Sequence, residues 1–306
     1  MSFISSSGPA GAAGTANTSS VDVSRAGTAR MRALRIFLRN PAALGGVLVL
    51  LTIVSMAALA GVLFPGDPLD MVGQPFLWPG ADRAFPFGTD SLGRDVLAGI
   101  VHGARVSLLV GLAAASLSLL IGMLVGAVAG YFGHAADAVL SRLIELVQTV
   151  PSFLLVIVIV AIGSPSVTTI ALAIGLASWP TVARLVRAEF RTLREADFVL
   201  AARSVGYRSS RIIVAEILPN ALPPVIVTTS VMVASAILIE SALSFLGMGD
   251  PNVVSWGSMI GAGREVLRSA WYLSALPGTA IILTVLALNL VGDALNDALN
   301  PRLRHD

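Results

Sequence analysis

The chain of 306 residues contains no cysteine and no lysine, so all 20 residues counted as Lys or Arg are arginine. Without cysteine it can form no disulfide, no thiolate nucleophile and no cysteine-ligated zinc site. Without lysine it can hold neither a Walker A phosphate-binding loop nor a Schiff base. The three histidines, His102, His134 and His305, are scattered and disfavour a histidine-rich metal site. The sequence therefore predicts no cofactor and no metal in this chain.

Charge is also scarce. Only 12% of the residues are charged and 55% are hydrophobic, and the mean hydropathy is +0.84. A typical soluble domain carries about 25% charged residues. This composition excludes an ordinary soluble enzyme and indicates a membrane protein.

Six apolar runs approach or exceed the length of about 20 residues that a bilayer span needs. They cover residues 42–64, 106–130, 138–162, 167–182, 224–246 and 272–295. Backbone groups in lipid must be hydrogen-bonded within their own segment, so the spans should be helices. The predicted fold class is an all-α membrane protein with six transmembrane helices. Pro151 and Pro180 fall within the third and fourth runs, where we expect each to kink its helix.

The arginines predict the orientation, because cytoplasmic segments of membrane proteins are enriched in Lys and Arg. With six spans, 15 arginines fall on one side and five on the other. The smaller group is Arg83, Arg94, Arg105, Arg264 and Arg268. Both termini are therefore expected to be cytoplasmic, with residues 1–40 and 299–306 forming tails, the first of them disordered. Residues 41–64 form the first span, and residues 65–105 an extracytoplasmic segment.

The cytoplasmic segment at about residues 190–220 is polar but patterned. Its apolar residues have the spacing of two short amphipathic helices. Gly206 lies between them, where a chain reversal can use a positive φ. Leu218 and Pro219 are expected to end the second helix. Such a segment is a docking element, and its apolar face could meet either its own bundle or a cytoplasmic protein.

The same segment resembles the Glu-Ala-Ala loop of the permease subunits of bacterial ABC importers. Ala201, Ala202, Gly206, Leu218 and Pro219 match that pattern in spacing. Two positions depart from it, since Leu200 replaces the glutamate and Glu216 stands where the pattern has isoleucine. The resemblance implies a coupling helix that docks on an ATPase subunit, carried by Ala201, Ala202, Gly206, Tyr207, Arg208, Leu218 and Pro219.

Further matches extend over residues 31–304. The run Phe87-Gly-Thr-Asp-Ser-Leu-Gly-Arg-Asp-Val-Leu97, the run Leu243-Ser-Phe-Leu-Gly-Met-Gly249 and the terminal run Asn289-Leu-Val-Gly-Asp-Ala-Leu295 resemble the C-type permease of dipeptide, oligopeptide and nickel importers. The resemblance implies a type I ABC importer transmembrane domain over residues 106–298, in the bacterial cytoplasmic membrane. It specifies the subunit type more closely than the cargo, which could be short peptides, nickel or another small solute.

The resemblance also implies the partners. These are a related second permease subunit, two ATP-binding subunits, an extracytoplasmic substrate-binding protein and the lipid bilayer, with no nucleic acid. ATP and magnesium would be held by the ATPase subunits, and no catalytic residues are expected in this chain. The absence of lysine agrees with this assignment, because a chain without a Walker A lysine needs a separate subunit to hydrolyse ATP.

Charged residues inside apolar spans are costly and are candidate functional groups. Arg142 and Glu145 lie three residues apart and are expected to pair on one helix face. Glu240 has no basic neighbour in its span. Glu240 and Glu145 are the candidate pathway or inter-subunit polar residues; for Glu240, a translocation cavity and a contact with another subunit remain equal alternatives.

Gly122, Gly126 and Gly130 recur every four residues in the second span. This small-xxx-small spacing lets helix backbones approach closely in lipid. The partner helix could lie in the same subunit or across a dimer, and we favour packing within the subunit.

Two other classes of membrane protein fit less well. A secondary transporter driven by an ion gradient would show inverted repeats and buried midplane acids. Glu240 and Glu145 fit that class weakly, but the two halves show no repeat. An intramembrane hydrolase would need a Ser–His pair or a metal motif, and His102 and His134 fall at opposite membrane faces on the predicted topology.

Overall fold

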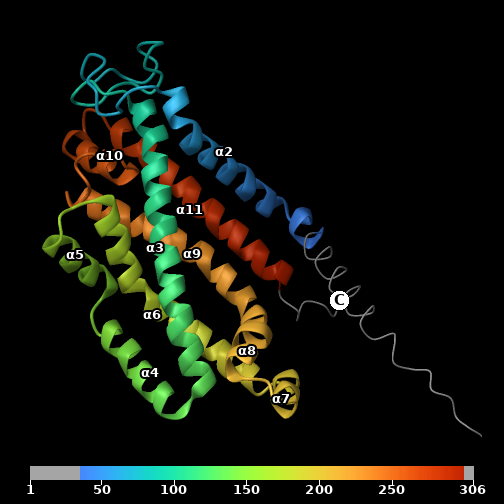
Figure 1. Ribbon diagram of the computed structural model, residues 1–306. Coiled ribbons are helices and arrows are strands. Elements are labelled where there is room, and N and C mark those ends of the chain that lie inside the picture. The colour runs from blue at the N-terminus through green and yellow to red at the C-terminus, as the bar shows by residue number, and fades with distance from the viewer. Residues whose placement is uncertain (1–34, 300–306) are drawn as a thin grey trace, which may run out of the picture.

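A computed structural model describes residues 35–299 of the chain, and every regular element within that range is helical (Figure 1). Most of the predicted N-terminal tail and residues 300–306 of the C-terminal tail lie outside the described range. Residues 35–39 are helical, so the prediction of disorder up to residue 40 was wrong at its end. Asn40 then caps the next helix, its side chain accepting hydrogen bonds from the backbone N–H groups of Ala42 and Ala43.

Five helical stretches are long and apolar enough to cross a membrane. They are α2 (Pro41–Leu63), α3 (Val96–Phe132), α6 (Val167–Arg194), the continuous stretch Ser209–Phe245 that ends in α9 (Leu218–Phe245), and α11 (Tyr272–Leu299). The second and fourth predicted spans were too short, because α3 begins ten residues before Val106 and α6 continues past Val182 to Arg194. His102 and Arg105 interrupt the apolar run before Val106, and the arginines from Arg184 onward make the end of α6 polar, so hydropathy alone does not show that either helix continues.

The third predicted span is broken. α4 (His134–Gln148) and α5 (Ser152–Ile162) meet at an angle of 77°, and together they can count as a sixth span. Pro151 stands at the N-cap of α5, and it lacks the N–H that would continue a helix from α4. Its effect is a break, sharper than the predicted kink. Pro180, by contrast, lies inside an uninterrupted α6.

The closest helix pair is α3 with α6, which lie side by side at the glycine stripe. A Cβ atom added to Gly122 would come within 2.5 Å of Val182 Cβ, and one on Gly126 within 2.5 Å of the Ala183 carbonyl oxygen. At Gly130 the nearest atom would be Phe190 Cβ at 2.6 Å. Only glycine permits this approach, and the preference for packing within the subunit is confirmed.

Residues 65–95 form an irregular cap over one end of the bundle (Figure 1). Gly88 and Gly93 have φ values of +77° and +79°, and an added Cβ would lie 2.1 Å and 2.2 Å from backbone oxygens. The Tyr272 hydroxyl, at the start of α11, donates to the carbonyl oxygens of Leu77 and Thr89, both at 2.9 Å. The cap is thus held in shape by internal backbone contacts that require glycine at two positions, and the Tyr272 hydroxyl ties it to the bundle.

Candidate functional site

The predicted docking segment forms a compact tip at the other end of the bundle. α7 (Asp197–Ser204) ends at Gly206, whose φ is +83°. The Gly206 N–H donates to the Arg203 carbonyl at 2.9 Å and the Tyr207 N–H donates to the Ala202 carbonyl at 3.1 Å. These two bonds form a Schellman motif, which satisfies the last carbonyls of a helix through a residue with positive φ. The predicted chain reversal at Gly206 is confirmed.

One face of the tip packs on the bundle. Val199 and Ala202 of α7 are buried with Ile212, Ile217 and Phe190 in one apolar cluster. Phe190 belongs to α6, so this cluster joins the tip to a membrane helix. The apolar face that was predicted to dock therefore packs in part against the helix bundle of the same chain.

A second set of apolar side chains on the tip remains exposed. Phe198 is 40% exposed, Leu200 44%, Val205 75% and Val214 61%. We call these four residues the tip surface. Gly206 beside them has no atom within 4 Å of an added Cβ, so another chain can approach its backbone closely. The tip surface is available to a partner.

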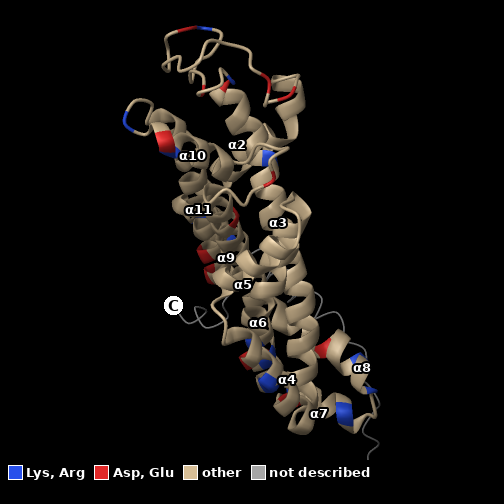
Figure 2. Ribbon diagram, turned by 90° about the vertical axis from the view of Figure 1, so that its left-hand side faces the viewer, with Lys and Arg blue, Asp and Glu red and all other residues tan. Residues whose placement is uncertain are grey.

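The tip lies at the arginine-rich end of the bundle (Figure 2). The Arg211 guanidinium stacks over the Tyr207 ring at 4.1 Å, and Arg203 lies 5.6 Å from the Tyr131 ring centroid. Arg208 is exposed and precedes α8 (Ser209–Arg211). Tyr207 is thus held by a cation–π contact, while Arg208 remains open to a partner.

Leu218 and Pro219 do not end the second amphipathic helix, so that prediction was wrong. The chain runs from α8 through a π-helix, Ile212–Ile217, directly into α9. The Leu218 N–H donates to the Ile213 carbonyl, a bond that spans five residues. Pro219 is the second residue of α9, directly after the π-helix. The tip is therefore continuous with a membrane helix.

Arg142 and Glu145 pair as predicted, with Nη1 and Oε2 at 3.1 Å. Both side chains are exposed on α4. A stronger ion pair lies nearby, since Arg187 of α6 contacts both carboxylate oxygens of Asp137 in α4. That pair could not be predicted from sequence spacing, because its members are 50 residues apart.

Glu240 is enclosed within its own subunit, with 2% exposure, and it borders a small cavity that Asp250 and Ser255 also line. Its predicted role at a translocation cavity or at another subunit stays a prediction. The Ser244 hydroxyl donates to its carboxylate at 2.8 Å, and the Ser107 and Ser241 hydroxyls at 3.4 Å. Ser107 also accepts from the Trp256 N–H at 3.4 Å. Glu240 therefore ties α9 to α3 and α10 (Trp256–Gly263) through serines. Its distant partner Ser107 could not be identified from sequence spacing.

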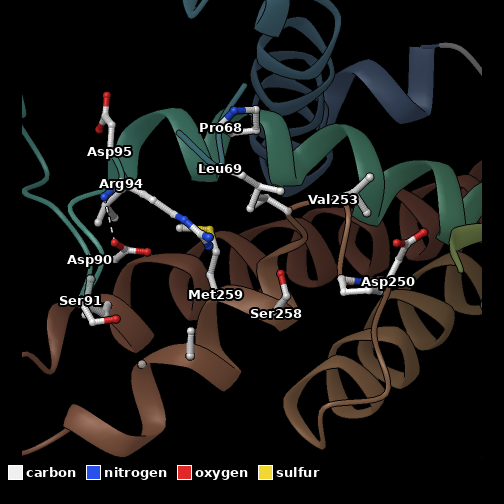
Figure 3. Close-up of a pocket in the computed structure, with 17 residues that line it drawn as sticks. Pro68, Leu69, Asp90, Ser91, Arg94, Asp95, Asp250, Val253, Ser258 and Met259 are labelled. Atoms are coloured by element: carbon white, nitrogen blue, oxygen red, sulfur yellow. Dashed lines mark hydrogen bonds between the residues drawn. The ribbon is translucent and has the colours of Figure 1, made fainter. Parts of the chain in front are cut away.

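A pocket of about 160 Å³ lies under the cap, between the start of α3 and the α9–α10 connection, and its largely apolar lining includes the charged residues Arg94 and Asp250. Figure 3 shows the Arg94 side chain reaching into it toward Met259, with Asp250 at the far end. Within residues 35–299, Arg94 Nε is a buried side-chain nitrogen without a hydrogen-bond partner. Burial raises the pKa of Asp95, against the lowering effect of hydrogen bonds from the backbone of Leu97 and Ala98.

Within residues 35–299 no group of three or more His, Cys, Asp or Glu is arranged to hold a metal ion. The arrangement instead offers a bundle with an exposed tip at one end and a capped pocket at the other. These are features of a transport component.

The architecture is shared with solved ABC importers. A chain of the inward-facing MetNI methionine ABC transporter superposes with a TM-score of 0.55 at 16% identity, over 66% of this chain and 96% of that one. A chain of an amino acid ABC transporter solved with histidines gives 0.52, also at 16% identity, over 66% and 95%. The fold is therefore that of a type I ABC importer permease.

Sequence comparison gives the family. Residues 122–305 match "Binding-protein-dependent transport system inner membrane component", and residues 29–79 match "N-terminal TM domain of oligopeptide transport permease C". The chain belongs to this family of inner membrane transport components.

Several relatives of similar length are named as peptide permeases. The "Di/tripeptide transport system permease protein DppC" of Pseudomonas aeruginosa is 40% identical over 88% of this chain and 91% of its own length. A "Putative peptide transport system permease protein" of Brucella suis is 41% identical over 85% and 87%. The "Dipeptide transport system permease protein DppC" of Bacillus subtilis is 38% identical over 87% and 83%.

Proposed function

We propose that this chain is one of two permease subunits of an ATP-driven importer of short peptides. The named relatives support the peptide cargo, since each is described as a peptide, dipeptide or di/tripeptide permease. Nickel or another small solute has no comparable support among them.

The tip surface carries the proposal that the chain couples to ATPases. Phe198, Leu200 and Val205 expose apolar area where the neighbouring faces of α7 are already packed on the bundle. Fully burying an exposed side chain of this size contributes about 1.5–3 kcal/mol, and these residues would contribute the share that corresponds to their exposed area. The tip surface, with Gly206, Tyr207 and Arg208 beside it, would sit in a recess of an ATPase subunit.

The remaining assembly follows from this coupling. A related second permease completes the pathway, two ATPases hold ATP and magnesium, and an extracytoplasmic protein delivers the peptide. The arginine excess at the tip end supports a cytoplasmic tip with both termini on that side. Closure of the ATPases would move the tip, and the rigid passage through the π-helix into α9 would carry this movement into the membrane. This chain itself performs no hydrolysis.

The proposal is tested by purifying a tagged chain in mild detergent and identifying the co-purifying proteins. We expect a second permease and two ATPases. Val205→Asp should lose the ATPases and retain the second permease, because a buried unpaired carboxylate is costly. Val72→Asp, the same change at an exposed valine of the cap at the opposite end of the bundle, is the matched control and should retain both.

Recovery of a solitary chain, or equal ATPase recovery by Val205→Asp and the unchanged chain, would contradict the proposal. A solitary chain that takes up solute along an ion gradient would instead identify a secondary transporter.

A further inference from the structure

A cavity of about 220 Å³ lies between α3, α5, α6 and α9. Its polar lining consists entirely of hydroxyl groups, and no charged side chain lines it. These hydroxyls belong to Ser118, Ser152, Ser178, Thr181, Thr228 and Ser235.

Two of these hydroxyls are already satisfied. Thr228 donates to the Pro224 carbonyl of its own helix at 2.9 Å, as Thr284 does to Ala280 in α11. Ser118 donates across to the Gly175 carbonyl of α6 at 3.1 Å. In lipid, a serine or threonine is tolerated in this way, by bonding to a backbone carbonyl within reach.

The other four hydroxyls have no hydrogen-bond partner within residues 35–299. They come from three helices, Ser152 from α5, Ser178 and Thr181 from α6, and Ser235 from α9. Ser152, Thr181 and Ser235 are exposed on the surface of the single chain. A hydroxyl left unpaired in an apolar medium costs roughly 1–3 kcal/mol. Four of them around one cavity therefore favour a side that faces water and solute rather than lipid.

We propose that this cavity is this chain's share of the translocation path and that Ser178, Thr181 and Ser235 bind the amide groups of the passing peptide. This inference rests on the proposed function. A hydroxyl both donates and accepts hydrogen bonds, so it pairs equally with a peptide N–H and a peptide C=O. The neutral lining makes no distinction between acidic and basic peptide side chains, so it suits a carrier of peptides of varied sequence.

The absence of cysteine from the whole chain provides a direct test. Ser178→Cys and Ser235→Cys are near-isosteric changes that place a single thiol in the cavity. Ser116→Cys is the matched control, because Ser116 is an exposed serine of α3 outside the cavity lining. Each variant is assembled with its partners in vesicles and treated with a charged, membrane-impermeant methanethiosulfonate, with and without saturating alanyl-alanine. ATP-driven uptake of alanyl-alanine is measured on the untreated vesicles.

The cavity thiols should react about tenfold faster than the control thiol, because reaction needs a hydrated thiolate. Alanyl-alanine should slow the reaction of the cavity thiols and leave that of Ser116→Cys unchanged. If the vesicles import alanyl-alanine but the cavity thiols are unreactive or unprotected, the path assignment is wrong while the proposed function stands. If no variant and no unchanged complex imports any peptide, the proposed function itself fails.

Discussion

At the residue scale, the run Phe87–Leu97, which joins the cap to α3, has a structural role. Gly88 and Gly93 occupy positive-φ positions pressed against backbone oxygens. Asp90 accepts hydrogen bonds from the backbone of Leu92 and Arg94 at 2.8 Å and 2.9 Å, and Asp95 caps α3 through Leu97 at 2.9 Å. These residues shape a turn and begin a helix.

Asp95 should tolerate loss of its charge but not of its oxygen acceptor. Asp95→Ala removes the cap and should cost about 1 kcal/mol of stability. Asp95→Asn keeps the acceptor. Burial raises the pKa of Asp95 in the folded chain, because the folded state disfavours the charged carboxylate. The wild type therefore loses stability as the pH rises through the folded pKa.

Thermal unfolding of the purified complex as a function of pH checks this sign. Asp95→Asn should match or exceed the wild type near neutral pH, and its advantage should shrink as the pH falls and Asp95 becomes protonated in both states. An advantage that grew in acid would contradict the assignment.

Substitution of Gly206 should destabilise the tip through backbone strain and not through a steric clash. Its φ of +83° is costly for a β-branched residue, while an added Cβ meets no atom within 4 Å. Gly206→Val should cost about 1–2 kcal/mol at the tip, and Gly206→Asn should cost less because asparagine tolerates the left-handed region. Co-purified ATPase should fall in that order. Equal ATPase recovery by the two variants would contradict a role for the Schellman turn.

The residues of the tip could be identified from sequence because their signals are local. The spacing of Ala202 and Gly206 indicates a helix followed by a reversal, and both features are found. Glu240 could not be placed in the same way. Its partner Ser107 is 133 residues away, and only the folded bundle brings the two together.

At the element scale, the contact of α3 with α6 depends on the glycine stripe. Gly126→Val would push Cβ to within 2.5 Å of the Ala183 carbonyl oxygen, and overpacking of this kind costs about 1–3 kcal/mol or more. Gly45→Val in α2 is the matched control, since its Cβ would meet no atom within 4 Å. The amount of folded protein in detergent should fall for Gly126→Val alone. Equal yields would show that α3 and α6 can separate without loss.

Sequence periodicity predicted the existence of the helices better than their ends. Hydropathy located the apolar cores of α2, α9 and α11. It missed the ten residues of α3 before Val106, where His102 and Arg105 interrupt an otherwise apolar stretch. It also missed the passage of the chain through Pro219, because proline is read as the end of a helix. The 77° angle between α4 and α5 depends on where each helix packs, which Pro151 alone does not specify.

At the scale of the whole molecule, three features follow one another along the bundle. The exposed tip lies at the arginine-rich end of the bundle (Figure 2). The pocket with Arg94 lies under the cap at the other end. The hydroxyl-lined cavity lies between them. This order matches the steps of import, in which a solute is received at one face, passes a neutral middle and is released where energy is coupled.

The central property of the proposed importer is that ATP hydrolysis drives uptake. The decisive measurement is uptake of alanyl-alanine into vesicles that contain the assembled complex, with ion gradients dissipated and ATP supplied to the ATPase side. Uptake should require ATP hydrolysis and should be lost in Val205→Asp. Uptake that persists without ATP and follows an imposed ion gradient would contradict the account.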